Sequence, residues 1–66
     1  MVNVKRIREL REKEGFSQQE LADRVHVVQN MIAQLEIGQK QPSATLLKSI
    51  ADVFGVTMDS LMMEAQ

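Results

Sequence analysis

The 66-residue sequence contains no cysteine, tryptophan or tyrosine, and its only aromatic residues are Phe16 and Phe54. The absence of cysteine excludes disulfides and thiolate metal sites as sources of stability. A chain of this length buries only a little over half of the surface that it exposes when unfolded, so we expect marginal stability. The core must therefore be aliphatic, and the spacing of the apolar residues predicts that helices supply it.

Long apolar runs are also missing from the sequence. No segment approaches the roughly 20 apolar residues that a membrane-spanning helix needs. The amino-terminal segment reads MVNVKRIREL, and it is too charged to be a secretory signal. We therefore expect a soluble protein of the cytoplasm.

Residue groups that would support catalysis or metal binding are absent as well. His26 is the only histidine, and no cysteine or acidic cluster accompanies it at a spacing typical of metal ligands. The sequence has no phosphate-binding loop, no nucleophile with a nearby base and no pair of carboxylates suited to a buried site. A chain this short also leaves little room for a closed pocket. We expect no enzyme activity, no cofactor and no metal.

The net charge of −1 is unusual for a protein that binds nucleic acid, but the charges are unevenly distributed. Residues 1–48 hold all eight lysines and arginines against six acidic residues, a balance of +2. Residues 49–66 hold three acidic residues and no base, a balance of −3. Binding to phosphates through the first part of the chain is therefore compatible with the charge, although it would be strongly salt-dependent.

Apolar periodicity and capping residues predict five helices. The expected ranges are residues 4–14, 18–25, 29–37, 44–54 and a short helix from 58, followed by a tail at 63–66. Capping residues are expected at Asn3, Ser17, Ser43 and Thr57, with a capping box between Ser17 and Glu20. The sequence thus predicts one compact all-α, five-helix domain over residues 1–66, with its core in residues 4–62.

The segment from residue 18 to 38 is the most informative part of the chain. It reads QQELADRVHVVQNMIAQLEIG and predicts two short helices joined by a tight turn, a helix-turn-helix at residues 18–37. In the second helix Ile32 and Leu35 are spaced to face inward. Its remaining faces carry the amides Gln29, Asn30 and Gln34. Such a face is suited to the major groove of DNA, because amides pair bidentately with adenine.

A longer pattern runs through this segment: Gln18-x-x-Leu21-Ala22-x-x-Val25, then Ile32-x-Gln34-Leu35-Glu36-x-Gly38. Around it lie, in order, Ile7-Arg8-Glu9-Leu10-Arg11, Pro42-Ser43, Leu46-Leu47-x-x-Ile50-Ala51 and Phe54-Gly55-Val56-Thr57-x-Asp59-x-Leu61. Together these segments cover about residues 4–62, and they resemble the DNA-binding domain of the lambdoid phage repressor and Cro family, the Xre-type regulators. The resemblance implies a lambda-repressor-like fold in a bacterial or phage-encoded transcriptional regulator, and specifically a repressor of phage or mobile-element type.

The resemblance also implies roles for individual residues. The expected base-reading residues are Gln29, Asn30, Ala33 and Gln34, of which Ala33 would touch a thymine methyl group. The family contacts phosphates at the positions of Ser17 and Gln18. From its own place near the tip of the loop after the third helix, Lys40 is a third expected phosphate contact, with Arg6, Arg11 and Arg24 as weaker candidates. Met31 is a weaker base contact, and packing between helices is the alternative for it. In such repressors an arginine and a glutamate pair between the first and third helices, so we expect a structural ion pair between Arg11 and Glu36. The alternative for the amides and charges is an ordinary solvated surface, and Ser17 would cap its helix in either case.

Two residues of the turn depart from the family. His26 stands where glycine is usual, because the backbone there is left-handed, and we expect some strain. Val28 stands where a serine or threonine cap is usual. Valine offers no acceptor, so we expect the third helix to lose about 1 kcal/mol of capping free energy.

Double-stranded DNA is the expected partner. We expect no second, oligomerising domain of the kind that longer relatives carry, and therefore a weak homodimer or one that forms on DNA. A two-fold operator would then have half-sites about 34 Å apart. The alternative function is that of an antitoxin or another protein-interaction module with the same fold. Its surface would be the cluster Met58, Met62 and Met63 beside the acidic carboxyl-terminal segment, which could equally be a homodimer contact.

Overall fold

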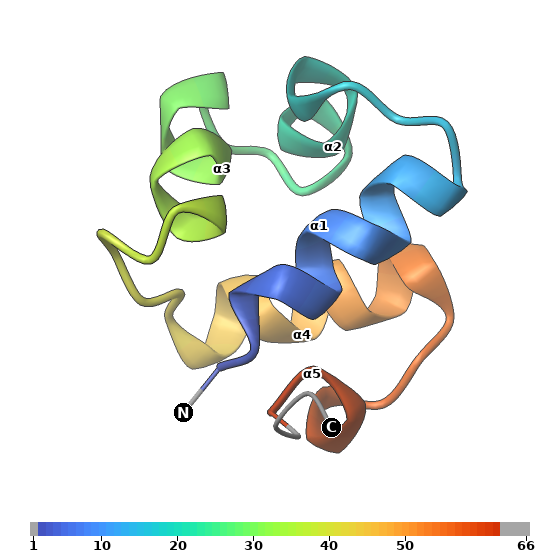
Figure 1. The fold of residues 1–66 in the computed structure, drawn as a ribbon. Helices are drawn as coiled ribbons and strands as arrows, with labels where there is room; N and C mark the ends of the chain where they lie inside the picture. Colours follow the sequence, from blue (N-terminus) through green and yellow to red (C-terminus); the bar gives the residue numbers. More distant parts are fainter. Residues whose placement is uncertain (1, 63–66) are drawn as a thin grey trace.

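The computed structural model describes residues 2–62, which form five α-helices and no strand (Figure 1). The helices are α1 (Val4–Lys13), α2 (Gln18–Arg24), α3 (Gln29–Glu36), α4 (Ala44–Phe54) and α5 (Met58–Met62). Each helix starts at the residue predicted from the sequence. α1, α2 and α3 each end one residue before the predicted end. The all-α, five-helix architecture is therefore confirmed. The predicted tail, including Met63, lies outside the described residues.

α1 runs through the middle of the molecule (Figure 1). α2 and α3 lie together on one side of α1, α4 runs along the opposite side of α1, and α5 lies at the end of the molecule farthest from α2 and α3. The backbone N–H of Asn3 donates to the carbonyl of Leu61 (2.7 Å), which ties the start of α1 to α5. Among the described residues, no helix has the length and apolar character required to cross a membrane.

The core is aliphatic, as the composition predicts. All five helices contribute to it, and its fully buried large side chains are Ile7, Leu21, Ile32, Leu35, Ile50 and Leu61. The two aromatic rings lie at its edge, where Phe16 stacks on Phe54 with the ring centroids 6.3 Å apart. The guanidinium of Arg24 lies over the Phe16 ring, 4.3 Å from its centroid.

Polar side chains cap four of the helices. Asn3, Ser17, Ser43 and Thr57 each accept a hydrogen bond from the backbone N–H three residues later. At α2 the Glu20 carboxylate also accepts from the backbone N–H of Ser17 (3.0 Å), so the predicted capping box is present. This hydrogen bond from Ser17 lowers the pKa of Glu20. Ionised Glu20 therefore stabilises the fold above the pKa it has when unfolded, and this contribution is lost as the pH falls through its folded value.

The turn between α2 and α3 has the predicted left-handed residue. His26 has φ 62°, the only positive φ of a non-glycine residue in the described part of the chain. The turn is closed by the Val27 N–H, which donates to the Ala22 carbonyl (3.0 Å). A side chain in this conformation is strained by its Cβ atom, so His26 costs stability that glycine would not cost.

We expect His26→Gly to stabilise the protein by about 0.5–1 kcal/mol, because relief of the strain exceeds the entropy gained by the unfolded chain. Urea titration should show a higher midpoint at an unchanged slope. The matched control is Gln41→Gly in the loop before α4, where φ is not positive and glycine should be mildly destabilising. A lower midpoint for His26→Gly would contradict the strain argument.

Candidate nucleic-acid interface

The predicted base-reading residues all lie on α3. Gln29 and Asn30 are exposed in its first turn, and Ala33 and Gln34 are half-buried one turn later. The opposite side of the helix is fixed in the core by its two buried residues, Ile32 and Leu35. The amides are thus presented by a short helix that is anchored from behind. That they read bases stays a prediction.

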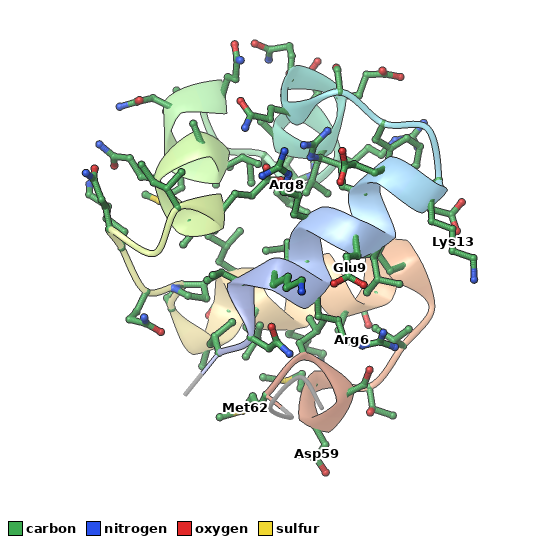
Figure 2. All side chains as sticks on the ribbon, in the orientation of Figure 1. Arg6, Arg8, Glu9, Lys13, Asp59 and Met62 are labelled. Carbon is green, nitrogen blue, oxygen red and sulfur yellow. The ribbon has the colours of Figure 1, made fainter. Side chains whose placement is uncertain are left out.

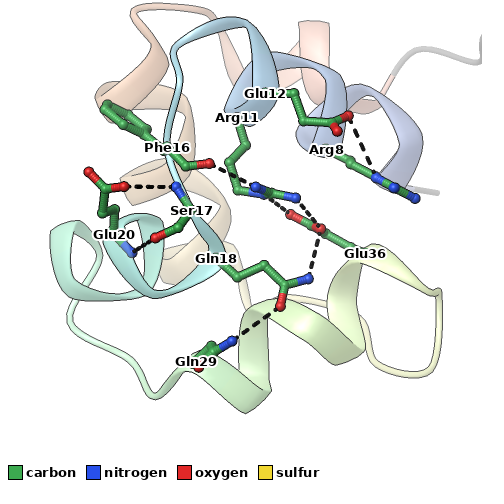
Figure 3. Close-up of polar contacts among 9 residues, drawn as sticks. All are labelled: Arg8, Arg11, Glu12, Phe16, Ser17, Gln18, Glu20, Gln29 and Glu36. Carbon is green, nitrogen blue, oxygen red and sulfur yellow. Dashed lines mark hydrogen bonds and ion pairs between the residues drawn. The ribbon is translucent and has the colours of Figure 1, made fainter.

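The predicted ion pair between Arg11 and Glu36 is present (Figure 3). Arg11 Nε donates to Glu36 Oε2 (2.6 Å), and Arg11 Nη2 donates to Glu36 Oε1 (3.0 Å). The contact between the guanidinium and the carboxylate is therefore bidentate. The side chains are only 12% and 3% exposed. The hydrogen bond to Glu36 raises the pKa of the Arg11 guanidinium, although burial opposes this shift.

This ion pair links three parts of the fold. The Arg11 Nη1 atom also donates to the carbonyl oxygen of Phe16 (2.7 Å), in the connection between α1 and α2. Glu36 is the last residue of α3, where a negative charge meets the negative end of the helix dipole and is unfavourable by itself. Arg11 offsets this charge and fastens α1, the α1–α2 connection and the end of α3 to one another.

Gln18 makes two side-chain contacts that the sequence did not indicate. Its Nε2 donates to Glu36 Oε1 (3.1 Å), and its Oε1 accepts from Gln29 Nε2 (3.4 Å), as Figure 3 shows. Because a carboxylate only accepts, Glu36 fixes which way the Gln18 amide faces. Gln18 then takes one N–H of Gln29 and leaves the Gln29 oxygen and its other N–H available. These hydrogen bonds form a series, Arg11–Glu36–Gln18–Gln29. Through this series a buried ion pair orients the exposed side-chain amide of Gln29 on α3.

Some of the positively charged side chains contact other residues of the fold, and others are exposed. Arg6 Nε donates to Ser60 Oγ (3.3 Å), Arg24 covers Phe16, and Arg8 pairs loosely with Glu12 at 3.6 Å. Lys40 is exposed in the loop after α3, and it is the only lysine or arginine between Arg24 and Lys48. Lys40 is thus an exposed cation in the loop that directly follows α3.

Of the remaining predicted site residues, Ser17 is exposed at the start of α2 and serves as its cap. No group of three or more histidine, cysteine or acidic side chains within residues 2–62 is arranged to hold a metal ion. At the other end of the molecule, Met62 and Asp59 project outward from α5 (Figure 2). Met58 packs against the core, so of the predicted methionine cluster only Met62 is an exposed large apolar residue among those described.

Comparison with known proteins gives concordant results. Residues 7–61 match a family described as helix-turn-helix. The chain is 36% identical over 61 residues to the HTH-type transcriptional regulator AnsR of Bacillus subtilis, covering 92% of this chain and 53% of AnsR. It is 45% identical over 56 residues to an HTH-type transcriptional regulator of Archaeoglobus fulgidus, covering 85% of this chain and 80% of that protein. The chain thus spans about half the length of AnsR and most of the archaeal relative.

The fold is also found among solved structures. The P22 c2 repressor in complex with a synthetic operator superposes with a TM-score of 0.88 and 26% identity, covering 94% of both chains. The lambda-repressor-like arrangement that the sequence predicts is therefore confirmed.

Proposed function

The chain belongs to the helix-turn-helix family of Xre-type transcriptional regulators, and from this membership we propose that it binds double-stranded DNA in a sequence-specific manner through α3. We further propose that it acts as a repressor of phage or mobile-element type and not as an enzyme. The observation that carries the proposal is the oriented amide of Gln29, held by Gln18 at the exposed start of α3. Its action on DNA would place it in the cytoplasm of a bacterial cell, as a bacterial or phage-encoded protein.

The free atoms of Gln29 suit one base in particular. With one N–H given to Gln18, the amide keeps one donor and one acceptor, the pair that adenine N7 and N6 match in the major groove. Asn30 adjoins Gln29, and Ala33 and Gln34 lie one turn further along the same helix. We propose that these four residues contact base edges. Lys40, Ser17 and Gln18 would contact phosphates of the DNA backbone that flank the contacted bases.

Two copies of the chain are proposed to act together on DNA. The P22 c2 repressor was solved on a synthetic operator. We propose that this chain recognises a two-fold site, with half-sites about one helical turn or 34 Å apart, as a weak homodimer or as two copies paired on DNA. A protein-interaction module is the alternative, and the exposed Met62, which projects from α5 as Asp59 does, supports it.

The test begins with selection of bound duplexes from random DNA. We expect Gln29→Ala and Gln34→Ala each to cost about 1–3 kcal/mol of binding free energy on the selected site and little on random duplex. Lys40→Ala should weaken binding to both DNAs alike and reduce the salt slope by about one unit. Fluorescence anisotropy at several salt concentrations measures both quantities.

The matched control is Gln41→Ala, an exposed glutamine outside α3 that should change neither quantity much. If all three test variants weakened selected and random DNA equally, α3 would not read bases. If a toxin bound tightly while no duplex did, the interaction module would replace the regulator.

A further inference from the structure

The start of α3 differs from the start of every other described helix. Four helices have an Asn, Ser or Thr side chain that accepts from the first turn, whereas Val28 occupies this position in α3 and makes no such bond. Val28 is also the most exposed large apolar side chain among the described residues, at 71%. In the free protein this valine therefore neither caps the helix nor fills the core.

The position of Val28 suggests where its side chain is buried instead. It directly precedes Gln29, whose amide is oriented by Gln18, and Asn30, which is exposed beside it. In the major groove the feature that an apolar side chain recognises is the C5-methyl group of thymine, which cytosine lacks. Ala33, the methyl contact expected from the sequence, is smaller and already half-buried, so it offers less free apolar surface.

We propose that Val28 is a specificity-determining residue that packs against the C5-methyl group of a thymine next to the base contacted by Gln29. The inference rests on the proposed function, since it requires α3 to enter the major groove. It explains why a polar cap is absent only here: a capping hydroxyl would hold the helix start but would present a polar surface to the methyl group.

The probe is the duplex selected from random DNA, with each thymine replaced in turn by deoxyuridine, which removes the methyl group alone. For the full 66-residue chain we expect one thymine per half-site whose replacement raises Kd about fourfold, the factor for one buried methyl group. Val28→Ala should bind the same duplex more weakly and should no longer distinguish thymine from deoxyuridine at that position.

Two further variants separate reading from stability. Val28→Ser restores a capping hydroxyl, so its melting temperature should rise while its discrimination against deoxyuridine is lost. Ile37→Ala truncates the exposed apolar residue at the other end of α3, 67% exposed, and should keep the discrimination of the unmodified chain.

The outcomes distinguish the two proposals. If no sequence is enriched, base reading itself fails and the proposed function fails with it. If a sequence is enriched but no thymine methyl matters, or one matters equally with and without Val28, only the role of Val28 is overturned. If Val28→Ala leaves DNA binding intact but abolishes binding to a protein partner, Val28 belongs to a protein interface.

Discussion

Arg11→Ala and Glu36→Ala are each expected to unfold most of the protein at 25 °C. Removing one partner of a buried ion pair costs about 3–5 kcal/mol, because the other charge is left buried without compensation. The total stability of a chain of 66 residues is itself only roughly 3–10 kcal/mol at 0.05–0.15 kcal/mol per residue. Thermal melts followed by circular dichroism measure the loss directly.

The two single variants should differ in severity. Glu36→Ala leaves the Arg11 guanidinium, already 12% exposed in the intact pair, with the Phe16 carbonyl as a partner. Arg11→Ala leaves the Glu36 carboxylate, the more buried partner in the intact pair at 3% exposed, at the carboxyl end of α3 with Gln18 as a hydrogen-bond donor but no compensating cation. We therefore expect Arg11→Ala to lower the melting temperature further.

The control for both variants is Arg8→Ala on the same helix. Arg8 pairs with Glu12 at 3.6 Å with both side chains more than half exposed, and such pairs contribute about 0–1 kcal/mol. Replacing Arg11 with Met and Glu36 with Leu together should be milder than either alanine variant, since no unpaired charge remains. An unchanged melting temperature for Glu36→Ala would show that the ion pair does not stabilise the fold.

The features that the sequence predicted well, the helix caps and the apolar helix faces, depend on residues that are close together in the chain. A cap involves residues three positions apart, and an apolar helix face involves residues three or four apart, so Asn3, Ser17, Ser43 and Thr57 could be assigned without knowledge of the packing. The left-handed turn at His26 and the pairing of Arg11 with Glu36 came from the family resemblance. These two features depend on contacts or backbone angles that helical periodicity alone does not specify.

Gln18 shows what the sequence could not indicate. Its partners Gln29 and Glu36 lie on another helix, 11 and 18 residues away, and they meet only after α2 packs on α3. The stacking of Phe16 on Phe54 with Arg24 over it is hidden for the same reason. In both cases the residue types are compatible with several kinds of contact. Which contact forms is decided only by the packing of the helices.

The same contacts connect stability with the proposed recognition. Glu36 accepts from Arg11 on one side and from Gln18 on the other, so the pair that fastens α3 to α1 also sets the orientation of the Gln29 amide. A variant that weakens this pair without unfolding the chain should therefore lose selectivity between sequences as well as stability.

The second large effect is expected for Ile32→Ala. Ile32 is fully buried, and it is one of only two buried residues that hold α3 in the core. Truncation of a buried isoleucine to alanine costs about 2–5 kcal/mol through lost burial and the cavity left behind. The cost should lie toward the upper end of this range, because α3 has eight residues and no side-chain cap to hold it once the anchor is lost.

Ile37→Ala is the matched control, since it removes the same atoms from the end of the same helix at a side chain that is 67% exposed. It should change the free energy of unfolding by less than about 0.5 kcal/mol. Urea titration measures both variants, and amide hydrogen exchange should show that Ile32→Ala exposes the N–H groups of α3 before those of α4. A cost below about 1 kcal/mol for Ile32→Ala would mean that Leu35 alone anchors the helix.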